Sequence, residues 1–226
     1  MNLFFDTEFT GLRKNTTLIS IGIVSEDGRK FYAEFSDFDI RQCDNWIKEN
    51  VLRNLYLPKL LGKDTLRETW DEINRWKKNG YLVADSYTVS NEWFGNVYPT
   101  CKANGNVKEV VGNKSWVSAC LNDWFLQFDT IQFVSDVCHY DFVLLIDLIT
   151  NGGTALDLPE TISAVCHDIN QDIAQHFGVT DAEAFDMSRE QIMNDLCGSE
   201  AIVTGDKHNS LYDAEVIRAI YKEIGK

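Results

Sequence analysis

The sequence predicts an α/β protein with a mixed sheet that is flanked by helices and interrupted by a β-type insertion. Three observations support this prediction. Short apolar runs near the N-terminus are joined by tight turns, the apolar spacing then changes to a helical period, and strand-like runs alternate with helical ones in the second half of the chain. Antiparallel strands followed by such an alternation are typical of a mixed sheet with helices on its faces.

Three strands are expected first, over residues 3–5, 17–24 and 31–35. Residues 26–29 have the Gly and Asp composition of a hairpin turn between the last two. Strands connected this tightly should pair in antiparallel fashion.

Two amphipathic helices follow, over residues 46–55 and 66–76, and the second begins at a start signal, Asp64–Thr65. Residues 81–114 are polar and rich in Asn and Gly turns, with a short strand at 107–111. We interpret them as an insertion or flap within a single domain that covers residues 1–226.

The second half returns to regular alternation. The expected elements are a helix at 115–128, a strand at 130–135, a helix through 142–149, a strand at 161–169, two short helices and a last helix at 211–224.

The charge balance restricts the kind of partner. With 35 acidic and 21 basic side chains the net charge is −14, so the chain repels phosphate at long range. A protein that coats duplex nucleic acid through its own charge is excluded. Any polyanion must be met locally, through metal ions.

The six cysteines form no C-x-x-C pair and are interpreted as reduced thiols. The N-terminus lacks a basic region before its apolar residues, and no apolar run approaches the roughly 18 residues of a membrane span. We therefore expect a soluble, cytoplasmic protein without a signal peptide or a membrane contact.

Asp6 and Glu8 follow an apolar strand and, being two residues apart, should project from the same face. Two carboxylates this close repel each other. They either emerge into solvent at the strand end or form a divalent-metal site.

A second motif places His208 five residues before Asp213 at the start of the last helix. Ser210 and Asp213 also match a helix capping box, which needs no metal. The box does not explain His208, which is either structural or catalytic.

Together these two motifs resemble those of the DEDDh family of 3′-to-5′ exonucleases. Residues 46–52 (WIKENVL) and 166–169 (CHDI) are similar to blocks of the small bacterial and phage exoribonucleases of that family. The resemblance implies a ribonuclease H-like mixed five-stranded sheet. It also implies four carboxylates that hold two Mg²⁺ or Mn²⁺ ions, which lie roughly 3.5 to 4 Å apart in such sites.

The family pattern implies a further acid after the fourth strand. Tyr140–Asp141 fits this pattern, and Asp136, at the end of the expected strand, is the competing residue. The implied metal ligands are Asp6, Glu8, Asp141 and Asp213, with His208 as the base. Asp168 is either a support of the site or a helix N-cap.

The resemblance implies a 3′-to-5′ exonuclease that releases nucleoside 5′-monophosphates from single-stranded RNA or DNA 3′ ends, with RNA favoured. Thr7 and Phe9 would contact the terminal nucleotide, Phe9 by stacking on its base, although Phe9 also fits a core position. Two alternatives stay open, namely a proofreading or interaction module on the same fold and a phosphodiesterase of DNA or small dinucleotides. A homodimer is also left open.

Overall fold

The computed structural model describes residues 1–225 except 64, 85, 87, 90–91 and 199–202. Asp64 of the expected helix start signal and parts of the expected insertion therefore lie outside the described residues. The five cysteines whose side chains are described are free thiols. None of the helices formed by the described residues has the combined length and apolarity needed to cross a bilayer.

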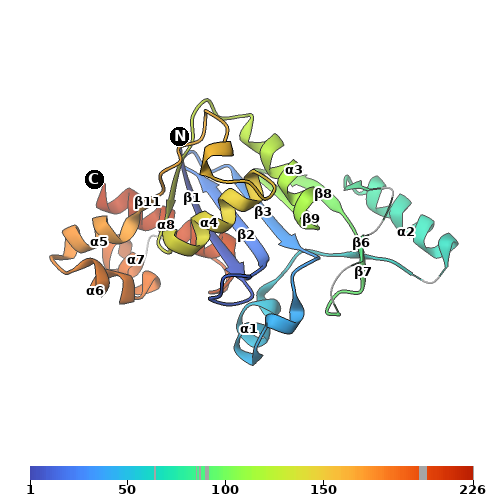
Figure 1. Cartoon of the computed structure of the whole chain (residues 1–226), viewed down its shortest axis with the longest axis horizontal. Helices are drawn as coiled ribbons and strands as arrows, with labels where there is room; N and C mark the ends of the chain where they lie inside the picture. Colours follow the sequence, from blue (N-terminus) through green and yellow to red (C-terminus); the bar gives the residue numbers. More distant parts are fainter. Residues whose placement is uncertain (64, 85, 87, 90–91, 199–202, 226) are drawn as a thin grey trace.

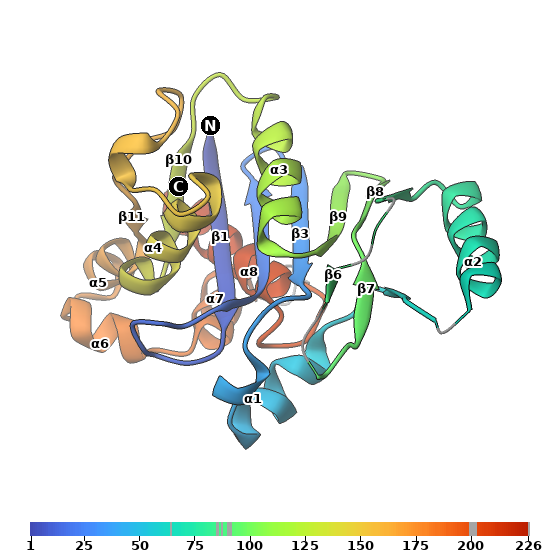
Figure 2. The same cartoon turned by 45° about the vertical axis from the view of Figure 1, so that its right-hand side comes forward.

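The main sheet is mixed, as the sequence predicted. Its described strands follow the order β11-β10-β1-β2-β3-β9-β8-β5 (Figure 2). Strands β1, β2 and β3 pair in antiparallel fashion, whereas β10 pairs parallel to β1 and to β11. The bounds are β1 Asn2–Phe9, β2 Leu18–Ser25, β3 Lys30–Phe35, β5 Leu82–Val83, β8 Thr100–Asn104, β9 Val107–Gly112, β10 Gln132–Ser135 and β11 His167–Asp168.

The five expected strands lie side by side from β11 to β3, and the sheet continues beyond them. Residues of the expected insertion add β9, parallel to β3, and then β8 and β5, so the described sheet has eight strands. The strand expected at 161–169 is much shorter. Ser163 and Val165 bond to each other in a local turn, which interrupts pairing between the Ile162 bridge to Ile131 and β11.

The helices differ from expectation mainly in their ends. The helix expected at 46–55 is divided into α1 and η2. Three short helices, rather than two, precede the last one. They are separate because Gly178 ends α5 in a left-handed conformation and Thr180 begins α6 with a capping box. The bounds are η1 Ile40–Gln42, α1 Asn45–Asn50, η2 Leu52–Asn54, α2 Leu66–Lys78, α3 Lys114–Phe125, α4 Cys138–Ile149, η3 Ala155–Asp157, α5 Ile169–Phe177, α6 Asp181–Asp186, α7 Arg189–Cys197 and α8 Ser210–Ile224.

Helices cover both faces of the sheet, α3 and α4 in front and α8 behind in Figure 2. Leu3 and Phe5 of β1 pack in the core that includes α3 and α4, whereas Phe4 packs with α5 and α8. Because side chains alternate along a strand, Asp6 and Glu8 continue the face of Phe4, toward α8.

A small second sheet, with order β4-β7-β6, lies beside the main one. It comprises β4 (Leu60–Leu61), β6 (Thr88–Val89) and β7 (Asn96–Tyr98). Helix α2 lies beyond it, at the end of the molecule opposite α5 and α6 (Figure 1). The acidic motifs are in the main sheet and its helices.

Candidate active site

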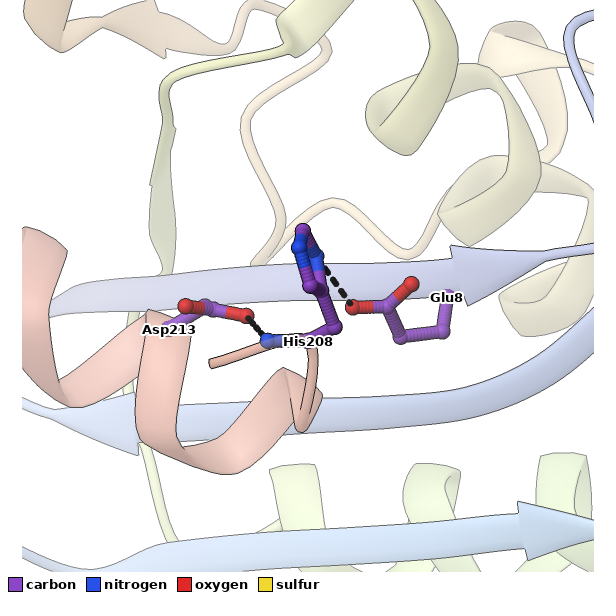
Figure 3. A group of neighbouring side chains, drawn as sticks. All are labelled: Glu8, His208 and Asp213. Atoms are coloured by element: carbon purple, nitrogen blue, oxygen red, sulfur yellow. Dashed lines mark hydrogen bonds and ion pairs between the residues drawn. The ribbon is translucent and has the colours of Figure 1, made fainter. Parts of the chain in front are cut away.

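Helix α8 approaches β1 closely enough to bring three of the sequence-predicted residues together (Figure 3). The Nδ1 atom of His208 lies 4.0 Å from Oε1 of Glu8, and the backbone N–H of His208 donates to Oδ2 of Asp213 at 3.0 Å. One ligand atom from each of these three side chains lies within 4.8 Å of the others. The strand motif and the helix motif therefore form one site.

The cap of α8 differs from the expected one. Asn209, not Ser210, is the N-cap, and its side-chain oxygen accepts from the N–H groups of Leu211 and Tyr212. Ser210 is the first helical residue, and its hydroxyl instead bonds to that of Ser20 on β2 at 2.9 Å. The expected capping box is wrong, because Asp213 bonds to the N–H of His208, before the N-cap.

Asp141 reaches the site from the other face of the sheet. It lies in the first turn of α4 and is 1% exposed. Its two oxygens accept from the hydroxyls of Thr7 at 2.6 Å and Ser135 at 3.1 Å. Thr7, pointing to the α4 side of β1, therefore orients this carboxylate, a contact that the sequence pattern did not indicate.

Asp136, the competing middle acid, also lies beside Asp6. Oxygens of Asp6, Asp136 and Asp141 lie within 4.8 Å of one another. The two candidates differ in their partners, because Asp136 forms an ion pair with Arg189 at 2.7 Å. No local motif marks Arg189, and its role depends on the packing of α7.

The carboxylates are electrostatically strained. Burial raises the pKa of Asp6 and Glu8 well above their ordinary values, and the neighbouring acids raise both further. Burial raises the pKa of Asp141 to about 8, against the lowering effect of its Thr7 hydrogen bond, and that of Asp213 to about 7. In the described part of the chain, neither lysine nor arginine forms an ion pair with these four acids.

His208 is suited to remain neutral. Burial lowers the pKa of its imidazole below the ordinary 6.5, and the nearby Lys207 lowers it further. The edge of the ring meets Trp46 of α1, with ring centroids 4.9 Å apart. Trp46 belongs to the block at 46–52, which contributed to the family resemblance but from which no site residue was predicted.

The donor set fits hard divalent cations. Mg²⁺ and Mn²⁺ prefer carboxylate oxygens, and five carboxylates converge here with one imidazole. A bound divalent cation would supply a countercharge to Asp6, Glu8, Asp141 and Asp213, none of which forms an ion pair with a lysine or arginine among the described residues. The arrangement is therefore consistent with divalent-metal use.

The site lies in a pocket of about 610 Å³ whose lining includes the four acids, Thr7, Phe9 and His208. Phe9 stacks on Tyr140 with ring centroids 5.6 Å apart and is only partly buried. A larger cavity of about 760 Å³ lies between α3 and strands β8 and β9 and is lined by none of these residues. The residues predicted to carry the chemistry therefore line the smaller of these two cavities.

Asp168 caps α5, one of its two expected roles.

Comparison with known proteins finds a local relationship in sequence. No protein-family model matches the chain. The 3′-5′ exoribonucleases of Mycobacterium tuberculosis strains H37Rv and CDC 1551 are each 43% identical to it over 58 residues, which are 26% of this chain and 34% of each relative. The chain therefore spans about a third of the length of the curated relatives that it matches.

The likeness in structure extends over the whole chain. The structure of S. pombe Pop2p in its Mg²⁺- and Mn²⁺-bound form matches 99% of this chain and 82% of Pop2p, with a TM-score of 0.50 and 14% sequence identity. At this identity the likeness concerns the fold alone. The chain thus has the ribonuclease H-like fold that the resemblance of its motifs implied, with eight described strands in the main sheet in place of the expected five.

Proposed function

We propose that this chain is a metal-dependent 3′-to-5′ exonuclease that releases nucleoside 5′-monophosphates from single-stranded nucleic acid, with RNA favoured over DNA. The observation that carries the proposal is the convergence of Asp6, Glu8, Asp141, Asp213 and His208 in one pocket. The short match to relatives named 3′-5′ exoribonucleases supports the choice of reaction and of RNA.

Asp6, Glu8, Asp141 and Asp213 would hold two Mg²⁺ or Mn²⁺ ions. When bound, such ions lower the pKa of the attacking water and stabilise the charge that develops on the scissile phosphate. The four carboxylates need a countercharge to be ionised together, because burial and mutual repulsion raise their pKa values. The acidic site can then bind a polyanion despite the net charge of −14.

His208 would act as the general base, since its lowered pKa keeps the imidazole neutral near pH 7. It accepts a proton from the attacking water. The water oxygen forms a bond to phosphorus, the bond from phosphorus to the 3′ oxygen of the preceding nucleotide breaks, and that oxygen takes up a proton. The products are a nucleoside 5′-monophosphate and a strand shortened by one residue.

Thr7 and Phe9 line the same pocket and are proposed to contact the terminal nucleotide. Phe9 offers an aromatic ring on which a base can stack. The hydroxyl of Thr7 has the additional partner Asp141.

The test is a time course with 5′-labelled and 3′-labelled RNA and DNA oligomers of equal sequence, in Mg²⁺, in Mn²⁺ and in chelator. We expect a metal-dependent ladder from the 5′-labelled strand and immediate release of labelled mononucleotide from the 3′-labelled one. A dinucleotide substrate distinguishes the small-phosphodiesterase alternative. The proposal is wrong if the wild-type chain shortens these substrates no faster than Asp213→Asn.

A further inference from the structure

His208 has an unusual backbone conformation for a residue with a side chain. Its φ angle is +64°, in the left-handed region, where Asn151 is the other described residue that is not glycine. Only a few per cent of non-glycine residues adopt this region, with Asn, Asp and His enriched among them, and they stay there when surrounding contacts hold them. The left-handed conformation of His208 therefore requires contacts on either side of it that enforce this conformation.

One residue of η2, Asn54, contacts the chain on both sides of His208. Its side-chain Nδ2 donates to the carbonyl oxygen of Lys207 at 2.7 Å. Its own carbonyl oxygen accepts from Nδ2 of Asn209 at 2.9 Å. These hydrogen bonds join residues more than 150 positions apart in the sequence.

Asn209 continues the connection into the core. It is 4% exposed, and its Nδ2 also donates to the hydroxyl of Tyr32 on β3 at 3.0 Å. The Tyr32 hydroxyl donates to Glu34, a fully buried carboxylate that also accepts from the N–H groups of Tyr56 and Leu57. The same carboxylate thus anchors both Tyr32 and the segment that follows η2.

We propose that Asn54 and Asn209 are positioning residues for His208, which hold its backbone in the left-handed conformation so that the imidazole lies over Glu8. This inference rests on the proposed function, in which His208 takes the proton of the attacking water. Neither asparagine lines the pocket, so neither is placed to contact the substrate there, and their hydrogen bonds hold the backbone on either side of His208.

The sharpest variant is Asn209→Ser. Serine remains a good N-cap, so the start of α8 is kept, while both Nδ2 hydrogen bonds are lost. A general base contributes about 10²- to 10⁴-fold in rate, so we expect its partial misplacement to lower kcat about tenfold, with KM changed less than about twofold. Asn54→Ala removes the bond to Lys207 and should act in the same direction.

A matched control is Asn113→Ser, the same change at the N-cap of α3, away from the site. It should leave kcat unchanged. An equal fall of kcat in Asn113→Ser and Asn209→Ser would overturn the inference, because a general loss of helix stability would then explain both.

A double variant separates positioning from stability. In a His208→Ala background, Asn209→Ser should lower the residual rate less than about twofold, because the group that it positions is already absent. If Asn209→Ser costs about tenfold in both backgrounds, Asn209 does not act through His208 and the inference is wrong.

Trypsin cleavage of the Lys207–His208 bond gives a readout without catalysis. The Lys207 side chain is 56% exposed, and its carbonyl oxygen is held by Asn54. We expect faster cleavage there in Asn54→Ala and Asn209→Ser than in the wild-type chain or Asn113→Ser, with cleavage at exposed Lys14 unchanged. Equal cleavage rates in all four chains would contradict the proposal that Asn54 and Asn209 hold the backbone around His208. This readout is independent of the proposed function, which fails separately if the wild-type chain is inactive on every oligomer.

Discussion

Gly22 of β2 lies directly beneath Leu211, in the first turn of α8. A Cβ atom on Gly22 would lie 2.3 Å from both the Cα and the N atoms of Leu211. Gly22 is also the partner of Asp6 in the β1–β2 ladder. The missing side chain thus lets the start of α8, with Asp213, approach the strand that bears Asp6 and Glu8.

Gly22→Ala should therefore displace α8 from the sheet, since backbone atoms cannot yield as the end of a side chain can. We expect a loss of about 1–3 kcal/mol in the free energy of unfolding, and a fall in turnover larger than this loss explains. Chemical denaturation and oligomer hydrolysis measure the two effects. Gly225→Ala, at the other end of α8, is the control and should be much milder, because its φ of −78° suits alanine and an added Cβ would lie 3.3 Å from its nearest backbone atom, the carbonyl oxygen of Tyr221. Normal activity in Gly22→Ala would contradict this role.

Variants of Asp141 and Asp136, the two candidate middle acids, should differ in whether they lower mainly turnover or mainly stability. Asp141→Asn is expected to lower turnover by several orders of magnitude, as are Asp6→Asn, Glu8→Gln and Asp213→Asn, without loss of metal-free stability. Asp136→Asn weakens the ion pair with Arg189, so we expect about 1–3 kcal/mol of lost stability and a mild effect on turnover. Steady-state kinetics and denaturation of both variants decide the assignment. The opposite pattern would make Asp136 the metal ligand.

The stability of the metal-free chain should fall as pH rises from about 5 to 9. The folded-state pKa values of Asp141 (about 8) and Asp213 (about 7) exceed the ordinary 3.8, so the folded chain binds more protons than the unfolded chain between these limits. This stabilisation is complete below the unfolded pKa and is lost as pH rises through 7 and 8.

We expect a total change of about a few kcal/mol, measured by denaturation in chelator. The lowered pKa of His208 should make stability rise with pH below 6.5, but this single group contributes less than the several acids whose pKa values are raised. The double variant Asp141→Asn, Asp213→Asn should show a flatter pH profile. A wild-type chain that becomes more stable across this range would contradict the raised pKa values of Asp141 and Asp213.

His208→Ala should lower turnover by about 10²- to 10⁴-fold, keep substrate affinity and alter the acidic limb of the rate profile. His176→Ala is the control, since His176 on α5 does not line the site pocket. The pH dependence of kcat/KM for both variants is the measurement. A well-folded His208→Ala chain that retains more than about a third of the wild-type rate would show that His208 is not the base.

Thr7→Val should weaken metal binding more at pH 7 than at pH 9. The Thr7 hydroxyl donates to Asp141 and lowers its pKa, so its loss raises the pKa of Asp141 further and lets protons compete with the metal. We expect the Mg²⁺ concentration for half-maximal activity to rise about tenfold at pH 7. Phe9→Leu serves as a comparison because it leaves the carboxylate contacts intact. A pH-independent change would contradict this explanation.

Several features followed from the sequence because they depend on local periodicity. Asp6 and Glu8 share a face since strand side chains alternate, and the apolar spacing of α2, α3 and α4 predicted those helices. The sequence-based predictions were wrong where a local side-chain hydrogen bond competes with the expected strand or helix cap. Ser163 and Val165 form a turn within an expected strand, and Asn209 competes successfully with Ser210 for the cap of α8.

By itself, the sequence determined the mixed sheet and the two acidic motifs, because strand and helix periods fix which side chains share a face. Only the tertiary structure decided that Arg189 pairs with Asp136 and that Asn54 bonds to the residues on both sides of His208. These contacts join segments that are distant in the chain, and they form only when α7 and α8 pack on the sheet. No local pattern encodes them, because their energies depend on distances that packing sets.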